Sequence, residues 1–250
     1  MTAPEDPMLR EWHSRDIFPW IFPKPALIYF FHVFGKEDVA RLRAKTHKQL
    51  IEKLRNAPDI QQQILALVDA QPIFKDMKFL HAWNRAFWDL PDCTEGCLKL
   101  RFYAMVLDEQ GNMITESANR RMTEQFGKQR FCTKTKCIRN TVQSRTDQAI
   151  GDCGHAPLWC LKKLWERGVH PEELPHYRFL EVGFYVNDFS PWISDDISYT
   201  CLQCQNEFAV FGVPQIFSVK YISGIAQWVA LPTKDNFYDT ASYATGRKKV

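Results

Sequence analysis

Two short stretches of the chain, "GHAPLWC" and "TCLQC", place histidine and cysteine where two successive helices are expected to begin. His155 opens the first expected helix, and Cys201 and Cys204 open the second. Imidazole nitrogen and thiolate sulfur are preferred ligands of zinc, and a catalytic zinc site takes three protein ligands and keeps one position open. Exposed N–H groups at a helix start also stabilise thiolates. The pattern therefore predicts a zinc site formed by His155, Cys201 and Cys204.

The elements that must position these ligands alternate between helix and strand. Residues 98–119 contain two runs of strand character around the turn sequence "DEQGN", which is typical of a β-hairpin. Apolar runs and turn residues then predict five further elements: helix 155–168, strand 177–186, helix 201–213, and strands 215–223 and 226–231. This order predicts an α/β fold with a mixed sheet, in which helix N-termini lie at the carboxyl ends of strands.

The first third of the chain is expected to be mostly helical after an aromatic-rich lead-in. Apolar residues near helical spacing predict one helix over 36–56 and a second over 59–70, and Pro72 begins a third. We see no chemistry in these helices. The chain is therefore expected to divide into a helical region at 1–92, an α/β domain at 93–232 and a polar tail at 233–250.

Composition and charge narrow the class of protein. The chain has 250 residues, is 45% hydrophobic and carries a net charge of +3, so it can bury a core, and its charge does not require it to bind polyanions. Prolines and Lys24 interrupt the apolar stretch 17–35, which we expect to be a buried extended segment or a packing arm rather than a membrane span. No secretory signal is evident, and the eight cysteines then favour metal ligation or free thiols over disulfides. We expect an intracellular protein, cytoplasmic or nuclear.

Three pieces of the chain, over roughly residues 98–230, resemble the zinc-dependent cytidine, deoxycytidylate and adenine deaminase superfamily, whose signature is H-x-E followed by P-C-x-x-C. They are the hairpin "FYAMVLDEQGNMITESANRR", the lead into the histidine helix "CIRNTVQSRTDQAIGDCGHA", and "YTCLQC". The resemblance implies a cytidine deaminase-like three-layer α/β/α fold with zinc on His155, Cys201 and Cys204. It also implies that Asn119, at the end of the hairpin, contacts the sugar of the substrate.

Two positions depart from this signature. Thr200 replaces the proline before the first cysteine, which is a mild change of loop geometry, and Pro157 replaces the glutamate of H-x-E. In the family that glutamate is not a ligand and moves a proton between the attacking water and the leaving ammonia. General acid–base help is worth about two to four orders of magnitude, and proline has no titratable group. Glu207 is a weak substitute candidate, as are Asp195 and Asp196.

A rival account of the cysteines is purely structural. Cys132, Cys137 and Cys153 precede His155 and could form a second metal site, as some nucleotide-type members of the resembling family have an extra zinc there. Cys160 lies beside apolar residues and is expected to be a buried thiol. Under a further alternative the histidine and the Cys-x-x-Cys are core residues that bind no metal.

Basic residues gather between 118 and 148, where few acidic residues balance them. Either this is a solvated loop, or Arg120, Arg121 and Lys128 contact the phosphates of a nucleotide or nucleic acid. The second alternative predicts binding that weakens as the salt concentration rises.

Three functions stay open at this stage. The first is a catalytically impaired deaminase-like protein that binds zinc and acts as a nucleotide- or nucleic-acid-binding protein, or as a partner subunit in a homo- or hetero-oligomer with another deaminase-fold chain. The second is an active zinc-dependent hydrolytic deaminase of a cytosine or adenine nucleotide or nucleic acid that uses a relocated carboxylate. The third is an interaction module in which zinc only stabilises the fold.

Overall fold

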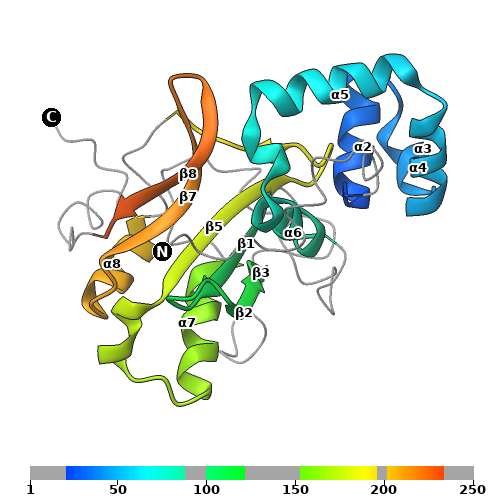
Figure 1. The fold of residues 1–250 in the computed structure, drawn as a ribbon. Coiled ribbons are helices and arrows are strands. Elements are labelled where there is room, and N and C mark those ends of the chain that lie inside the picture. Colours follow the sequence, from blue (N-terminus) through cyan, green and yellow to red (C-terminus); the bar gives the residue numbers. More distant parts are fainter. Residues whose placement is uncertain (1–20, 88–99, 122–152, 196–201, 234–250) are drawn as a thin grey trace, which may run out of the picture.

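The computed structural model describes residues 21–87, 100–121, 153–195 and 202–233 (Figure 1). Over these residues a helical region precedes a mixed sheet with helices, which confirms the expected α/β class. The helices are α2 (Lys24–Val33), α3 (Val39–Arg43), α4 (His47–Arg55), α5 (Pro58–Ala70), α6 (Met77–Arg85), α7 (Ala156–Glu166) and α8 (Leu202–Val210), with 3-10 turns at Pro72–Lys75 and Pro171–His176. The strands are β1 (Leu100–Leu107), β2 (Met113–Ala118), β3 (Arg120–Arg121), β4 (Cys153–Gly154), β5 (Arg178–Tyr185), β6 (Pro191–Trp192), β7 (Gln215–Ile222) and β8 (Ile225–Pro232).

Two sequence predictions for the helical region are wrong in their boundaries. The single helix expected over 36–56 is divided into α3 and α4, because the side chain of Thr46 accepts a hydrogen bond from the N–H of Gln49 and begins a new helix with a capping box. The helix expected from Pro72 likewise becomes a 3-10 turn followed by α6, since Asp76 caps the N–H of Phe79.

The stretch 17–35 is also not extended where the structure describes it. Residues 24–33 form α2, and Pro25 lies in its first turn, where the missing N–H of proline breaks no helical hydrogen bond. The prolines therefore mark the start of the helix instead of preventing it. Leu27, Phe30 and Phe31 are fully buried, so α2 is a core helix of the helical region.

Within the described residues, six strands form one mixed sheet in the order β2-β1-β5-β7-β8, with β6 paired to β5. Only β5 and β7 are parallel to each other among these pairs. The expected hairpin is present as β1 and β2, and Gly111 in its turn has a φ of +87°, which glycine adopts without strain. The strands β3 and β4 form a separate two-stranded ribbon.

Side chains alternate between the two faces of the sheet, and each face has its own apolar cluster. On β5, Leu180, Val182 and Phe184 pack with α2 and α6, whereas Phe179 packs with α7 and α8. The first cluster is the larger and joins the helical region to the sheet. The second cluster contains Cys204 of α8 and lies where the candidate ligands come together.

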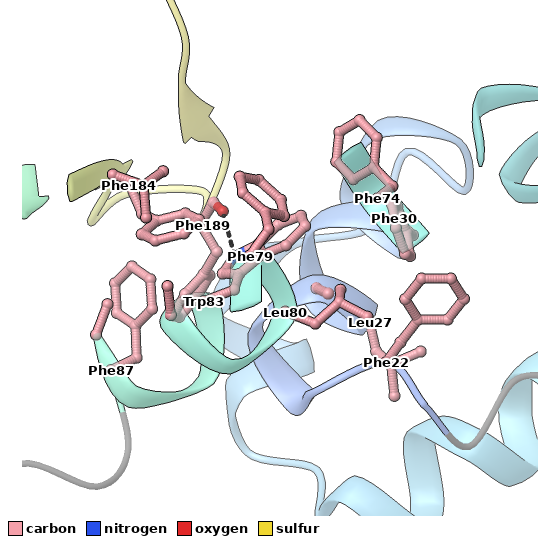
Figure 2. Close-up of a cluster of buried hydrophobic side chains, with 14 of the residues drawn as sticks. Phe22, Leu27, Phe30, Phe74, Phe79, Leu80, Trp83, Phe87, Phe184 and Phe189 are labelled. Carbon is pink, nitrogen blue, oxygen red and sulfur yellow. Dashed lines mark hydrogen bonds between the residues drawn. The ribbon is translucent and has the colours of Figure 1, made fainter. Parts of the chain in front are cut away.

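Trp83 of α6 lies at the centre of the larger cluster (Figure 2). Its ring is stacked on that of Phe184 of β5, with centroids 5.6 Å apart and planes inclined by 17°. Its indole N–H donates to the backbone carbonyl of Phe189 at 2.9 Å. Phe189 has a φ of +63°, which is unfavourable for a bulky side chain, so this hydrogen bond holds the loop after β5 in a strained conformation.

A polar network at the edge of this cluster connects α6 to the hairpin. The carboxylate of Glu116 on β2 accepts hydrogen bonds from Arg85 and from the hydroxyl of Tyr103, and His81 Nε2 lies 2.8 Å from its Oε2. Partial burial alone would raise the pKa of Glu116, but these hydrogen bonds from His81, Arg85 and Tyr103 outweigh it and lower the pKa to about 2. Burial, followed by the hydrogen bond to Glu116, raises the pKa of Tyr103.

The network predicts a specific acid sensitivity. Because the ordinary pKa of Glu116 is 4.5 and the folded protein lowers it to about 2, the unfolded chain takes up this proton at the higher pH. The stabilisation is fully present above 4.5 and is lost as the pH falls toward 2. We therefore expect urea unfolding to show a smaller loss of stability over this interval in Glu116→Gln than in the parent. Glu172→Gln, an exposed control outside this network, should keep the parent's dependence, and an unchanged profile in Glu116→Gln would contradict the network.

Candidate metal centre

The structure brings together His155 and Cys204, two of the three predicted zinc ligands. His155 is the residue directly before α7, and Cys204 lies in the first turn of α8. The Sγ atom of Cys204 is 3.2 Å from Nδ1 of His155, although the two residues are 49 positions apart in the chain. Both helices pack on the same face of the sheet, so their N-termini meet at one point.

Helix α7 is fixed along the hairpin by three side chains at helical spacing. Cys160 Sγ donates to the carbonyl of Ala104 on β1 at 3.5 Å, and Lys163 Nζ donates to the carbonyl of Glu116 on β2 at 2.6 Å. Arg167, just after the helix, donates to the carbonyl of Ile114. These contacts determine where the N-terminal residue His155 stands relative to the sheet.

Helix α8 is fixed by packing on the parallel strands. Phe208 is fully buried, and its ring meets that of Phe179 on β5 edge-on with centroids 4.7 Å apart. Cys204 lies one turn earlier on the same buried side and has no exposed surface. The packing therefore directs Cys204 inward toward the start of α7. This is the direction that Cys204 needs if it and His155 are to bind the same ion.

The distance between these two atoms fits a shared ion. Zinc–sulfur and zinc–nitrogen bonds of about 2.3 and 2.0 Å in a tetrahedron separate the two donors by about 3.5 Å. The observed 3.2 Å between Cys204 Sγ and His155 Nδ1 is close to this value. Among the described residues, however, no group of three or more His, Cys, Asp and Glu side chains gathers around one point. The third predicted ligand, Cys201, lies outside the described residues.

Pro157 occupies the first turn of α7 and is buried. It suits this position because its fixed φ is helical and its missing N–H leaves no helical hydrogen bond unmade. The side chain two residues after His155 is therefore an apolar ring without a titratable group. Glu207, the substitute that the sequence suggested, lies in α8 three residues after Cys204 and is half-buried, and Asp195 is exposed. Their role as substitutes stays a prediction.

Glu181 is a buried carboxyl residue that the sequence analysis missed. It lies in the middle of β5 with only 5% of its surface exposed, between Ala104 on β1 and Ser218 on β7. It has the same side-chain parity as Phe179, so it is on the face that α7 and α8 cover. A single charged residue inside the apolar run "FLEVGFYV" is the signal that could have identified it.

Cys160 has the properties of the buried thiol expected from the sequence. It is fully buried and forms no disulfide. Burial raises the pKa of its thiol, so it stays protonated at neutral pH and is a poor metal ligand. Cys204 is buried in the same apolar cluster but differs in its position, because its Sγ lies 3.2 Å from Nδ1 of His155.

Asn119 lies directly after β2 and is committed to the backbone of β1. Its side-chain oxygen accepts a hydrogen bond from the N–H of Phe102, and its side-chain nitrogen donates to the carbonyl of Leu100, both at 3.1 Å. These bonds continue the hairpin ladder beyond the last paired residue of β2. The contact with a substrate sugar stays a prediction, and these backbone bonds are the structural role that the side chain has here.

The remaining predicted residues are described only by their backbone or not at all. Arg121 pairs with Cys153 in the ribbon of β3 and β4, and Arg120 pairs with Gly154, which places this ribbon directly before His155. The other residues of the predicted second metal site and basic loop, namely Cys132, Cys137 and Lys128, lie outside the described residues.

Comparisons with known proteins found no match to this chain among protein-family models, curated proteins or solved structures. No helix in the described ranges has the length and apolar character needed to cross a membrane. The interpretation of the site therefore depends on the geometry of its own residues.

Proposed function

We propose that this chain is a zinc-binding protein with a cytidine deaminase-like three-layer α/β/α architecture and an impaired catalytic site. His155, Cys201 and Cys204 would hold the ion, and Pro157 would leave the site without its proton carrier. The observation that carries this proposal is the 3.2 Å approach of Cys204 Sγ to His155 Nδ1 at the starts of two helices.

The arrangement of the elements also supports the proposal. The helix that carries each ligand precedes one of the two parallel strands, α7 before β5 and α8 before β7. In open α/β sheets, ligands bind at the carboxyl ends of such strands, where helix N-termini expose N–H groups. Helices on both faces of the sheet are consistent with three layers.

The proposed activity is binding. A zinc ion in this site would supply Lewis-acid chemistry, but the chain needs its own group to accept and return a proton, and Pro157 cannot do this. What the chain would retain is the buried Cys204 beside the half-buried His155 at the starts of the two helices. This suits a nucleotide- or nucleic-acid-binding protein or a partner subunit of an active deaminase.

Metal content tests the ligand assignment. We expect the purified full chain to contain about one zinc ion that chelators remove slowly, because three protein ligands hold it. His155→Ala and Cys204→Ser should each lower zinc content and the melting temperature of the zinc-loaded protein, as measured by elemental mass spectrometry and calorimetry. Cys160→Ala is the matched control, since it removes a buried thiol of the same cluster without removing a ligand.

The opposite result has a clear form. Zinc content that stays the same in Cys204→Ser would show that this cysteine is not a ligand. Zinc that is present and only raises the melting temperature, without any effect on nucleotide or nucleic-acid binding, would favour an interaction module in which the metal stabilises the fold.

A second candidate function is supported by Glu181. This carboxyl group is buried in a central strand, on the sheet face that α7 and α8 cover. In this account Glu181 takes the proton-carrying role of the glutamate that Pro157 replaces at the start of α7. The chain would then be an active hydrolytic deaminase of a cytosine or adenine nucleotide or nucleic acid.

Turnover separates the two candidates. For the impaired protein, we expect no ammonia release from cytidine-, deoxycytidine- or adenosine-type substrates, and a gain of activity in Pro157→Glu that Pro157→Ala does not show. If the parent chain is active and Glu181→Gln lowers its turnover by about two orders of magnitude or more, the relocated carboxylate is the better account. The parent and all three variants are compared at equal zinc content.

A further inference from the structure

Four cations lie on and beside α3 and α4 without a partner in the described part of the chain. Their side chains are exposed, except that of Lys45, which is half-buried, and none makes an ion pair or hydrogen bond with another described side chain. We call this set the basic helical surface, and its members are Lys36, Arg41, Lys45 and Lys48.

The acidic residues of the same segment do not neutralise this surface. Residues 36–55 contain seven Lys or Arg and three Asp or Glu residues, an excess of four positive charges against a net charge of +3 for the whole chain. Asp38 accepts the backbone N–H of Arg41 at 2.9 Å as the cap of α3, and Glu37 pairs with Lys53 at 3.1 Å. The local field therefore stays positive.

The basic helical surface is held rigidly by the core beneath it. Leu42 of α3 and Leu50 and Leu54 of α4 are fully buried. Arg43 is not a member of the basic helical surface, because its side chain is already engaged. Its guanidinium lies 4.6 Å from the centre of the Phe189 ring and donates to the carbonyl of Val186. In Figure 1, α3 and α4 lie at the outer edge of the helical region, away from the sheet.

The chemistry of the surface selects among anionic partners. The large hydrophobic side chains that are exposed in the described residues lie on other elements, and none is on α3 or α4. Helices that bind a membrane surface combine cations with apolar side chains that enter the lipid. Flexible Lys and Arg side chains without apolar neighbours can instead contact phosphate groups. Contacts with the phosphate backbone dominate non-specific nucleic-acid binding.

We propose that the basic helical surface of α3 and α4 binds the phosphate backbone of nucleic acid without sequence preference. This goes beyond the metal site and does not need it, since the surface belongs to the helical region. It is also separate from the basic residues between 118 and 148 that the sequence analysis singled out.

Salt-dependent binding tests the proposal. Fluorescence anisotropy of the full chain with a labelled 20-base-pair duplex of arbitrary sequence, and with single-stranded RNA of equal length, is measured between 50 and 200 mM salt. We expect binding to at least one probe at 50 mM salt. In Arg41→Gln/Lys48→Gln, the slope of log affinity against log salt should fall in magnitude by about two, because about 0.9 of a counterion is released per phosphate contact.

The matched control is Lys75→Gln/Lys78→Gln, which removes the same charge from exposed positions outside the basic helical surface. We expect it to keep the parent's slope, and circular dichroism must show that both double variants are folded. Equal losses in the two variants, or no binding to either probe at 50 mM salt, would overturn the proposal. Binding to phosphatidylserine vesicles but to neither nucleic-acid probe would overturn it in favour of a membrane surface.

Discussion

The burial of Trp83 against the central strand is the interaction on which the rest of the structure depends. Its ring joins α6 to Phe184 of β5 and to Phe30 of α2, and its N–H holds the carbonyl of Phe189 (Figure 2). Strand β5 in turn pairs with β1, β6 and β7, so the helical region supports the strand around which the whole sheet is built. The loop that Trp83 fixes is the one that continues through β6 toward α8.

The opposite face of the sheet carries the two residues of the proposed metal site that the structure describes. There α7 is attached to the hairpin and α8 packs on the parallel strands, so His155 and Cys204 meet because two helices are positioned independently. On this face Pro157 lies in the first turn of α7, and Glu181 is buried in β5. One face therefore unites the helical region with the sheet, while the other brings His155 and Cys204 together. The basic helical surface is a separate feature, which rests on the larger apolar cluster through Leu42, Leu50 and Leu54.

Much of this could be predicted from sequence where local signals agree with the tertiary structure. The hairpin, α7, β5, α8 and β7 follow from apolar periodicity, turn residues and the first-turn proline, and the meeting of His155 with Cys204 follows from helices that precede parallel strands. Residues 24–33 were expected to be extended but form a helix, because the sequence alone does not distinguish prolines that begin a helix from prolines that prevent one. Networks such as that around Glu116 join residues 13 to 35 positions apart, and only the fold brings them together. Glu181 was not predicted as a site residue, because an apolar run predicts a buried strand whether or not one charged residue lies within it.

X-ray absorption at the zinc edge of the purified full chain tests the central claim most directly, because it reports the atoms around the metal. The account predicts a first shell with two sulfurs at about 2.3 Å and at least one nitrogen at about 2.0 Å, and one sulfur fewer in Cys204→Ser. A protein without zinc, or a shell of oxygen and nitrogen alone, would contradict it. In either case the approach of His155 to Cys204 would be core packing and not a metal centre.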